Sequence, residues 1–142
     1  MWWPKSGLAW LRFDLIGAII IVVAVGVGSR LLPVGSRLFD KYVGDALYAV
    51  LFYLLLCLVW PGGTATSKAW LIMAAMVVIE SFQLTGIPLQ LRLSGDPLLK
   101  IVSIVLGTAF SWLDIAAYLV GILGVWALDV CVFRFSTPPE AL

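Results

Sequence analysis

The sequence predicts an all-α membrane protein with four transmembrane helices and one short interfacial or half-inserted helix before the last span. Of the 142 residues, 63% are hydrophobic and only 12% are charged, whereas soluble domains average about 25% charged residues. Several apolar stretches approach the ~20 residues that a helix needs to cross a bilayer. We therefore expect residues 1–142 to form a single integral membrane domain.

The first two predicted spans cover residues 11–32 and 42–60. The centre of the first, residues 15–29, contains no charged side chain and is rich in Ile, Val and Gly. Arg30 and Pro33 mark its end, because proline cannot continue a helix. A short polar loop then leads into the second span.

The third predicted span covers residues 68–84, after the loop "PGGTATSK". Pro, Gly and Ser interrupt helical patterns, so this stretch is typical of a connection between spans. Thr85, Gly86 and Pro88 are expected to stop the third helix. The stretch that follows, up to Lys100, is predicted to contain a second polar loop.

A short helix is predicted over residues 97–108. Asp96 followed by Pro97 is a strong helix start, since Asp caps free backbone N–H groups and Pro suits the first helical position. A helix of this length cannot cross a bilayer. We therefore expect it to lie in the interface or to insert halfway.

The fourth predicted span covers residues 110–133. Its start, "SWLD" from Ser111 to Asp114, has the pattern of a capping box, in which the acidic residue reaches back to the helix start. The alternative is one long helix that merges this span with the short helix before it. Gly107 and the capping box argue for two separate helices.

Polar residues gather at one membrane face of this arrangement. Antiparallel spans bring the ends of the first and third helices to the same face as the starts of the second and fourth. The polar residues at these ends and in the adjoining loops are Arg30, Asp40, Asp45, Glu80, Gln83, Arg92, Asp96 and Asp114. The opposite face carries Lys5, Arg12, Asp14, Lys68, Asp129 and Arg134, spread over terminal and loop positions.

Each of three spans presents a carboxylate and a hydrogen-bonding neighbour on one side, because residues three or four apart share a helix face. These pairs are Asp45 with Tyr48, Glu80 with Gln83, and Asp114 with Tyr118. A charge in lipid costs several kcal/mol, so such groups normally face the bundle interior with a partner. Arg30 and Arg92 are the expected counter-ions. The predicted ligand-binding residues are therefore Arg30, Asp45, Tyr48, Glu80, Gln83, Arg92, Asp114 and Tyr118.

Purely structural roles are the alternative for these carboxylates. Asp45 and Asp114 lie near helix starts, where the helix dipole favours a negative charge. Glu80 lies near a helix end, where the dipole disfavours it, so a structural ion pair would be its alternative role.

Composition excludes several classes of function. The net charge of +1 argues against nucleic-acid binding, which needs a basic face. The chain has no His, which rules out His-ligated haem, His-bound zinc and a His general base within it. Cys57 and Cys131 lie in apolar runs, where thiols usually act as small hydrophobic side chains. We predict no metal and no cofactor, and the sequence identifies no catalytic residue.

Three motifs in order carry a resemblance to a known family. They are Gly-Asp-Ala at residues 44–46, Glu-x-x-Gln at 80–83 and Ser-Trp-x-Asp-x-x-Ala-Tyr-x-x-Gly at 111–121. Over residues 28–128 the chain resembles the VanZ-like group of small bacterial membrane proteins, and within it a branch catalogued only as a domain of unknown function. The resemblance implies a four-span protein of the bacterial inner membrane, in a group linked to low-level teicoplanin resistance. By resemblance, the family's polar positions are Arg30, Asp45, Glu80, Gln83, Asp114 and Tyr118.

The predicted function is binding or processing of a polar-headed lipid, such as a lipid-linked cell-envelope precursor. Arginines suit phosphate, and carboxylates suit sugar hydroxyls or amines. One alternative is a structural or accessory subunit of a larger membrane assembly, with other membrane proteins as partners. A second and less favoured alternative is a membrane enzyme that uses two carboxylates with separated pKa values.

Basic residues define the expected orientation only weakly. Lys5, Arg12, Lys68 and Arg134 lie on one face, and Arg30, Arg37, Lys41, Arg92 and Lys100 lie on the other. Basic loop residues favour the cytoplasmic side, and four against five does not decide between the faces. If Arg30 and Arg92 belong to the site rather than to loops, both termini are expected to be cytoplasmic.

Overall fold

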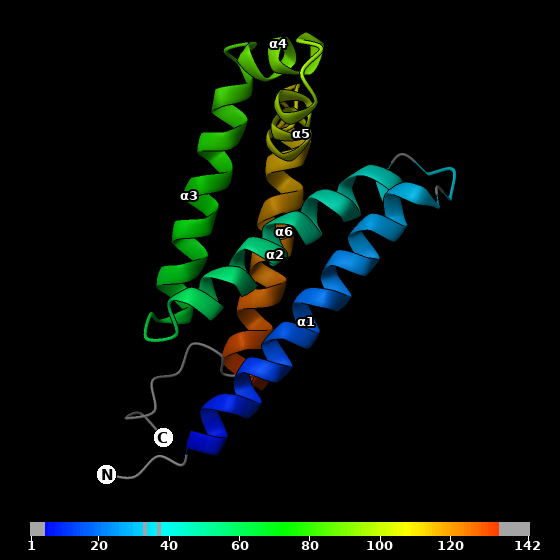
Figure 1. The fold of residues 1–142 in the computed structure, drawn as a ribbon. Coiled ribbons are helices and arrows are strands. Elements are labelled where there is room, and N and C mark those ends of the chain that lie inside the picture. The colour runs from blue at the N-terminus through cyan, green and yellow to red at the C-terminus, as the bar shows by residue number, and fades with distance from the viewer. Residues whose placement is uncertain (1–4, 33, 37, 134–142) are drawn as a thin grey trace.

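The computed structural model describes residues 5–32, 34–36 and 38–133, and all of their regular structure is helical (Figure 1). The elements are α1 (Lys5–Leu31), the π-helical turn η1 (Leu38–Tyr42), α2 (Val43–Val59), α3 (Ala65–Gln83), α4 (Ile87–Leu93), α5 (Pro97–Leu106), α6 (Trp112–Leu128) and the π-helical turn η2 (Asp129–Phe133). Four of the described helices are long and apolar enough to cross a membrane: Arg12–Leu31, Phe39–Val59, Ala65–Gln83 and Trp112–Cys131. The predicted four-span all-α fold is confirmed.

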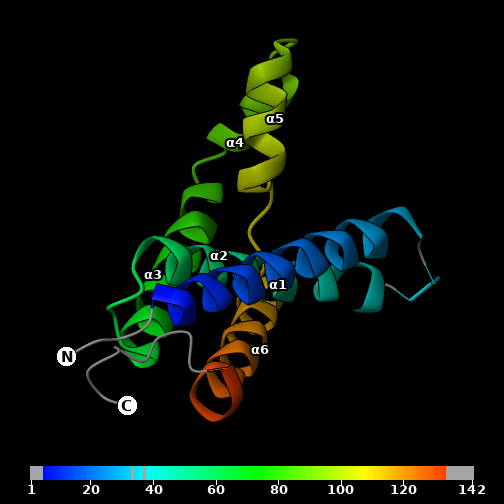
Figure 2. The ribbon, with the colours of Figure 1, turned by 60° about the horizontal axis from the view of Figure 1, so that its bottom comes forward.

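Helix α2 is the centre of the bundle, because it packs against α1, α3 and α6. Ala49 and Tyr53 of α2 are completely buried against Met76 of α3 and Ile122 of α6. Helix α1 packs chiefly on α2, and the two lie side by side in Figures 1 and 2. Leu15 is the only buried side chain among the described residues of α1, so most of this helix faces outward.

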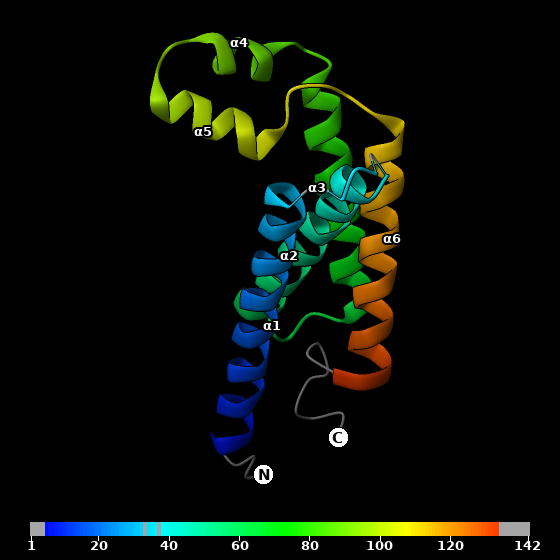
Figure 3. The same ribbon diagram turned by 90° about the vertical axis from the view of Figure 1, so that its right-hand side faces the viewer.

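Helices α4 and α5 form a hairpin at the end of the bundle where α3 ends and α6 begins (Figure 3). The sequence predicted α5, although it ends at Leu106 rather than at residue 108. Helix α4 was not predicted. Helix α3 ends at Gln83. Gly86, with a positive φ of 71°, is the N-cap of α4, and Pro88 lies in the first turn of that helix. Proline is common in the first turn of a helix as well as after a helix end. The sequence analysis considered Pro88 only as the end of a helix.

Helix α3 begins three residues earlier than expected, at Ala65. The Thr64 side chain caps it by accepting a hydrogen bond from the Ser67 backbone N–H at 3.1 Å. A capping threonine stabilises a helix start that a Gly- and Pro-rich stretch otherwise disfavours. Lys68 therefore lies inside the first turns of the span, where it is buried, and not in a loop.

The start of α6 differs from the predicted capping box. Two separate helices are confirmed, because α5 ends at Leu106, followed by Gly107 with a φ of 74°, and α6 begins at Trp112. Ser111 has the extended backbone of a cap, but its side chain makes no capping hydrogen bond. Its backbone N–H donates instead to Oε2 of Glu80 on α3, at 3.2 Å. A carboxylate from another helix thus takes the place that the box assigns to Asp114.

Candidate functional site

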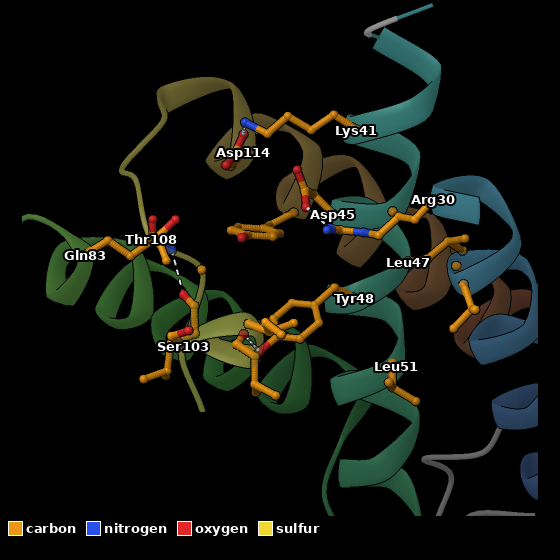
Figure 4. Close-up of a pocket in the computed structure, with 18 of the residues that line it drawn as sticks. Arg30, Lys41, Asp45, Leu47, Tyr48, Leu51, Gln83, Ser103, Thr108 and Asp114 are labelled. Carbon is orange, nitrogen blue, oxygen red and sulfur yellow. Dashed lines mark hydrogen bonds and ion pairs between the residues drawn. The ribbon is translucent and has the colours of Figure 1, made fainter. Parts of the chain in front are cut away.

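A cavity of about 590 Å³ lies between α1, α2, α6 and the segment that follows α5 (Figure 4). It is at the end of the bundle where α1 and α3 end and α2 and α6 begin. Its volume is within the ~300–1,000 Å³ typical of small-molecule sites. The predicted convergence of polar residues at one face is therefore accompanied by space for a ligand.

The first ion pair of the cavity joins Arg30 of α1 to Asp45 of α2. Arg30 Nη2 lies 3.0 Å from Asp45 Oδ1, and both residues line the cavity. Arg30 reaches Asp45 by crossing Gly44, where an added Cβ would lie 3.1 Å from Arg30 Nε. The absence of a side chain at Gly44 therefore leaves room for the Arg30 guanidinium to reach Asp45. The Asp45 side chain is only 10% exposed, whereas that of Arg30 is 61% exposed.

The second ion pair joins Lys41 of η1 to Asp114 of α6. Lys41 Nζ donates to Asp114 Oδ1 at 2.8 Å, and the two residues lie together at one edge of the cavity (Figure 4). Lys41 was not among the predicted site residues, because it was assigned to a loop. The spacing could have predicted its place in the site, because Lys41 precedes Asp45 by four residues and residues four apart share a helix face.

Glu80 is the buried centre of a hydrogen-bond network behind the cavity wall. Its Oε1 accepts hydrogen bonds from the Tyr118 hydroxyl at 2.9 Å and from Gln83 Nε2 at 3.2 Å. Its Oε2 accepts from the Ser111 backbone N–H at 3.2 Å. Glu80 is fully buried. It therefore joins α3 to α6 and positions two residues that line the cavity, Gln83 and Tyr118.

Two side chains of the site hold the last turn of α5. The Tyr48 hydroxyl donates to the Val105 carbonyl at 2.9 Å, and Gln83 Nε2 donates to the Leu106 carbonyl at 2.8 Å. The last carbonyls of a helix have no partner within that helix, so these bonds satisfy groups that would otherwise be unpaired. The α4–α5 hairpin is in this way tied to the rim of the cavity.

The remaining wall of the cavity is aliphatic. Its apolar lining comes from three elements and includes Val22, Val23 and Val27 of α1, Leu47 and Leu51 of α2, and Ile104 to Leu106 of α5. Along α2 the lining changes from Asp45 through Tyr48 to Leu51, which is a distance of roughly 9 Å at 1.5 Å per residue. Figure 4 shows Leu51 on the far side of Tyr48 from the ion pairs. The cavity therefore has a charged end and an apolar end.

The structure brings the eight predicted site residues together, but only some of them with the predicted partners: Arg30 pairs with Asp45, and Gln83 with Glu80. Seven of them line the cavity: Arg30, Asp45, Tyr48, Gln83, Arg92, Asp114 and Tyr118. Glu80 lies directly behind it. Tyr48 bonds to α5 rather than to Asp45, and Tyr118 bonds to Glu80 rather than to Asp114. Arg92 forms no ion pair with any residue that the structure describes.

A second group of buried polar residues lies at the opposite end of the bundle. The Tyr53 hydroxyl of α2 donates to Asp129 Oδ2 at 2.7 Å, and Asp129 and Lys68 are buried. The sequence assigned Lys68 and Asp129 to terminal and loop positions of this face. Their burial among the helices gives them a structural role in the part of the chain that the structure describes.

Metal ligands do not gather in the described residues, which contain no group of three His, Cys, Asp or Glu side chains that could hold a metal ion. The polar groups of the cavity are cations, carboxylates, an amide and phenols. These groups bind organic ions and hydroxyls by charge and by hydrogen bonds.

Residues 34–122 match the model of a family described as Protein of unknown function (DUF2809), over more than half of the chain. The chain belongs to this family. The matched region contains Asp45, Glu80 and Asp114 but not Arg30. No curated protein and no solved structure matches the chain significantly. Membership of a family of unknown function is thereby confirmed, whereas the predicted relationship to VanZ-like proteins is not shown. Any function must therefore be argued from the geometry of the site.

Proposed function

We propose that this protein binds the polar head group of a membrane lipid in the cavity between α1, α2, α5 and α6. The observation that carries the proposal is the division of the lining into a charged end and an apolar end. Ion pairs surround one end, and aliphatic side chains of α1, α2 and α5 form the other. A ligand that suits both ends has a charged head and an apolar tail, as a membrane lipid does.

The exposure of the two paired cations supports an anionic group in that head. The side chains of Arg30 and Lys41 are 61% and 51% exposed, whereas those of their carboxylate partners are 10% and 9% exposed. The cations can therefore contact a ligand while the carboxylates stay in place. Arg92 adds a third positive charge to the lining. Phosphate is the anion that arginine recognises best.

The resemblance to VanZ-like proteins favours a lipid-linked cell-envelope precursor as the ligand and the bacterial inner membrane as the location. The carboxylates Asp45 and Asp114 suit the hydroxyls or amines of such a head group. An enzyme would use this same pair as acid and base. Because each carboxylate is held by a cation, binding is favoured over catalysis.

Native mass spectrometry of the mildly extracted protein tests the proposal. We expect the wild-type chain to carry a lipid and the Lys41→Ala variant to carry it in a several-fold smaller fraction of molecules. Lys100→Ala is the matched control, because Lys100 is an exposed cation of α5 that does not line the cavity. A wild-type protein that neither retains lipid nor binds added lipid saturably would contradict the proposal.

A subunit of a larger membrane assembly is the second candidate, and the outer face of α1 favours it. Gly17 and Gly28 of this helix have open space where a Cβ would lie, and small residues of this kind allow close helix packing in membranes. The same mass spectra distinguish the two functions. A mass equal to one chain plus lipid supports lipid binding alone, whereas additional protein mass supports an assembly.

A further inference from the structure

Two buried hydrogen-bond acceptors in the cavity wall have no donor. Asp45 Oδ2 and Gln83 Oε1 are inaccessible to solvent and accept no hydrogen bond from any residue that the structure describes. Both side chains line the cavity, and their residues are only 7% and 6% exposed. Buried polar groups in native proteins are nearly always paired, so these two acceptors indicate what the ligand must supply.

The orientation of the Gln83 amide is fixed by its neighbours. Its nitrogen donates to Glu80 Oε1 at 3.2 Å and to the Leu106 carbonyl at 2.8 Å. Both of these neighbours are acceptors, so a rotated amide would place its oxygen against two other oxygens. Gln83 Oε1 must therefore remain the unpaired acceptor.

The Asp45 carboxylate is only half satisfied by the cations around it. Arg30 Nη2 bonds to Oδ1 at 3.0 Å, and Lys41 is bound to Asp114 instead. Oδ2 receives no donor from the described residues. An ionised carboxylate accepts several hydrogen bonds, so a donor on the ligand would complete its shell.

We propose that the cavity selects phosphodiester lipids whose head-group alcohol carries its own hydrogen-bond donor, either an ammonium or a hydroxyl. This inference rests on the lipid-binding function proposed above. A small shift of the side chains that cover these two atoms lets the donor pair with Asp45 Oδ2 or Gln83 Oε1, and the phosphate lies against the exposed cations Arg30, Lys41 and Arg92. A head group without a donor leaves these acceptors unpaired, which costs binding free energy.

Two pairs of lipids with the same acyl chains separate the donor from the charge. Phosphatidylethanolamine has an ammonium donor, and phosphatidylcholine has the same net charge but a quaternary ammonium with no N–H group. Phosphatidylglycerol has hydroxyl donors, and phosphatidylmethanol has the same net charge but no donor. We expect the donor lipid of at least one pair to bind the full-length protein about tenfold more tightly than its donor-free partner, measured by native mass spectrometry titration. A preference within the first pair would identify an ammonium as the donor, and a preference within the second would identify a hydroxyl.

Asp45→Asn provides the matched variant, because it replaces the unpaired acceptor with an amide that can turn its N–H₂ group toward the ligand. If the donor pairs with Asp45, this change should bring the ratio of affinities close to one. An unchanged ratio would assign the donor to Gln83 instead. Asp96→Asn is the control, because it makes the same Asp-to-Asn change at an exposed helix cap outside the cavity. Asn caps a helix as well as Asp does.

The outcomes also separate this inference from the proposed function. Equal binding within both charge-matched pairs to the wild-type protein would overturn the donor requirement and leave lipid binding in place. No saturable binding of any of these lipids would overturn both. The wild-type ratio alone decides the inference if Asp45→Asn does not fold.

Discussion

At the scale of single residues, Glu80 is the side chain whose environment is least expected. It lies in the last turn of α3, where the helix dipole disfavours a negative charge. Three donors from Tyr118, Gln83 and Ser111 compensate for this position and for its complete burial. Both oxygens receive donors, so the network depends on an acceptor at each of them.

Replacing Glu80 by Gln should destabilise the protein by about 1–3 kcal/mol, although the side chain keeps its shape. The new amide nitrogen must face either the Ser111 N–H or the Gln83 amide nitrogen, and both of these are donors. Thermal unfolding in detergent, followed by tryptophan fluorescence, measures the change. Asp96→Asn replaces a carboxylate by an amide at an exposed cap and should be nearly neutral. Equal midpoints for the two variants would contradict this role of Glu80.

Removing only the cation of the Lys41–Asp114 pair should destabilise the protein more than removing both charges. Lys41→Met should cost about 1–3 kcal/mol, because it leaves the Asp114 carboxylate, which is only 9% exposed, without its cation. Adding Asp114→Asn should restore part of this loss, since the uncompensated charge is then removed. A double-mutant cycle on unfolding free energies gives the coupling. Lys100→Met is the control for loss of an exposed charge. A coupling near zero would show that the pair does not stabilise the fold.

At the scale of elements, the motifs that carry the resemblance in the sequence consist of residues that contact one another across helices. Gly44 gives the Arg30 side chain its path, and Asp45 binds it. Ala46 lies against Gly121 of α6, where an added Cβ would overlap the Ala46 carbonyl. The Gly-Asp-Ala motif of α2 therefore positions α1 on one side and α6 on the other. These contacts explain why the motifs have small residues beside charged ones.

Gly121→Ala should separate α2 from α6 and cost about 1–3 kcal/mol, as is typical of overpacking. The clash is with backbone atoms, so no side-chain rotation relieves it. Gly124→Ala is the matched control in the same helix, because a Cβ at Gly124 meets nothing within 4 Å. The thermal midpoints of the two variants should differ clearly. If Gly121→Ala is as stable as Gly124→Ala, then the close approach of α2 and α6 is wrong.

The attachment of the α4–α5 hairpin makes a further prediction. Tyr48→Phe removes the hydrogen bond to Val105, which is worth about 1 kcal/mol, so the hairpin should open roughly fivefold more often. Ser103 is completely buried, and a Ser103→Cys reporter should therefore react faster with a soluble maleimide. Exposed Cys131 is replaced by Ser in this background, whereas buried Cys57 is kept.

Tyr42→Phe is the control for this experiment, since the Tyr42 hydroxyl makes no hydrogen bond with a described residue. Its reporter should react at the wild-type rate. A Tyr48→Phe rate that equals the Tyr42→Phe rate would argue against attachment through Tyr48.

Helix starts were predicted correctly from the sequence where the capping residue bonds within its own helix. The Asp96–Pro97 start of α5 is confirmed, because the Asp96 carboxylate accepts from the backbone N–H of Leu98 at 2.8 Å. The capping box at Ser111 was wrong because its donor and its acidic residue both found partners on other helices. Local patterns are decisive only where no tertiary contact competes with them.

At the scale of the whole molecule, antiparallel topology was sufficient to predict which residues meet at one membrane face. It was not sufficient to predict all of their partners. Residue spacing identifies the side of a helix that a residue occupies, but it does not determine the rotation of one helix against the next. Tyr118 shares a face with Asp114 and still reaches Glu80, because α6 packs against both α2 and α3.

The assignment of cations to the site also sharpens the expected orientation in the membrane. Arg30, Lys41 and Arg92 line the cavity, and Lys68 is buried at the other face. The basic residues left for the loops and ends are Lys5, Arg12 and Arg134 on the face of the termini, and Arg37 and Lys100 on the face of the site. Three against two is a small difference in the direction of cytoplasmic termini and a site that faces away from the cytoplasm, so this orientation stays a prediction.

Cysteine labelling in intact cells tests this orientation. Ser94 lies in the exposed turn between α4 and α5, and Gly62 lies in the exposed loop between α2 and α3 at the opposite face. In the background with Cys131 replaced by Ser, a membrane-impermeant maleimide should label Ser94→Cys directly. It should label Gly62→Cys only after the membrane is permeabilised. The reverse pattern would place the site on the cytoplasmic side, where its lipid would have to come from the inner leaflet.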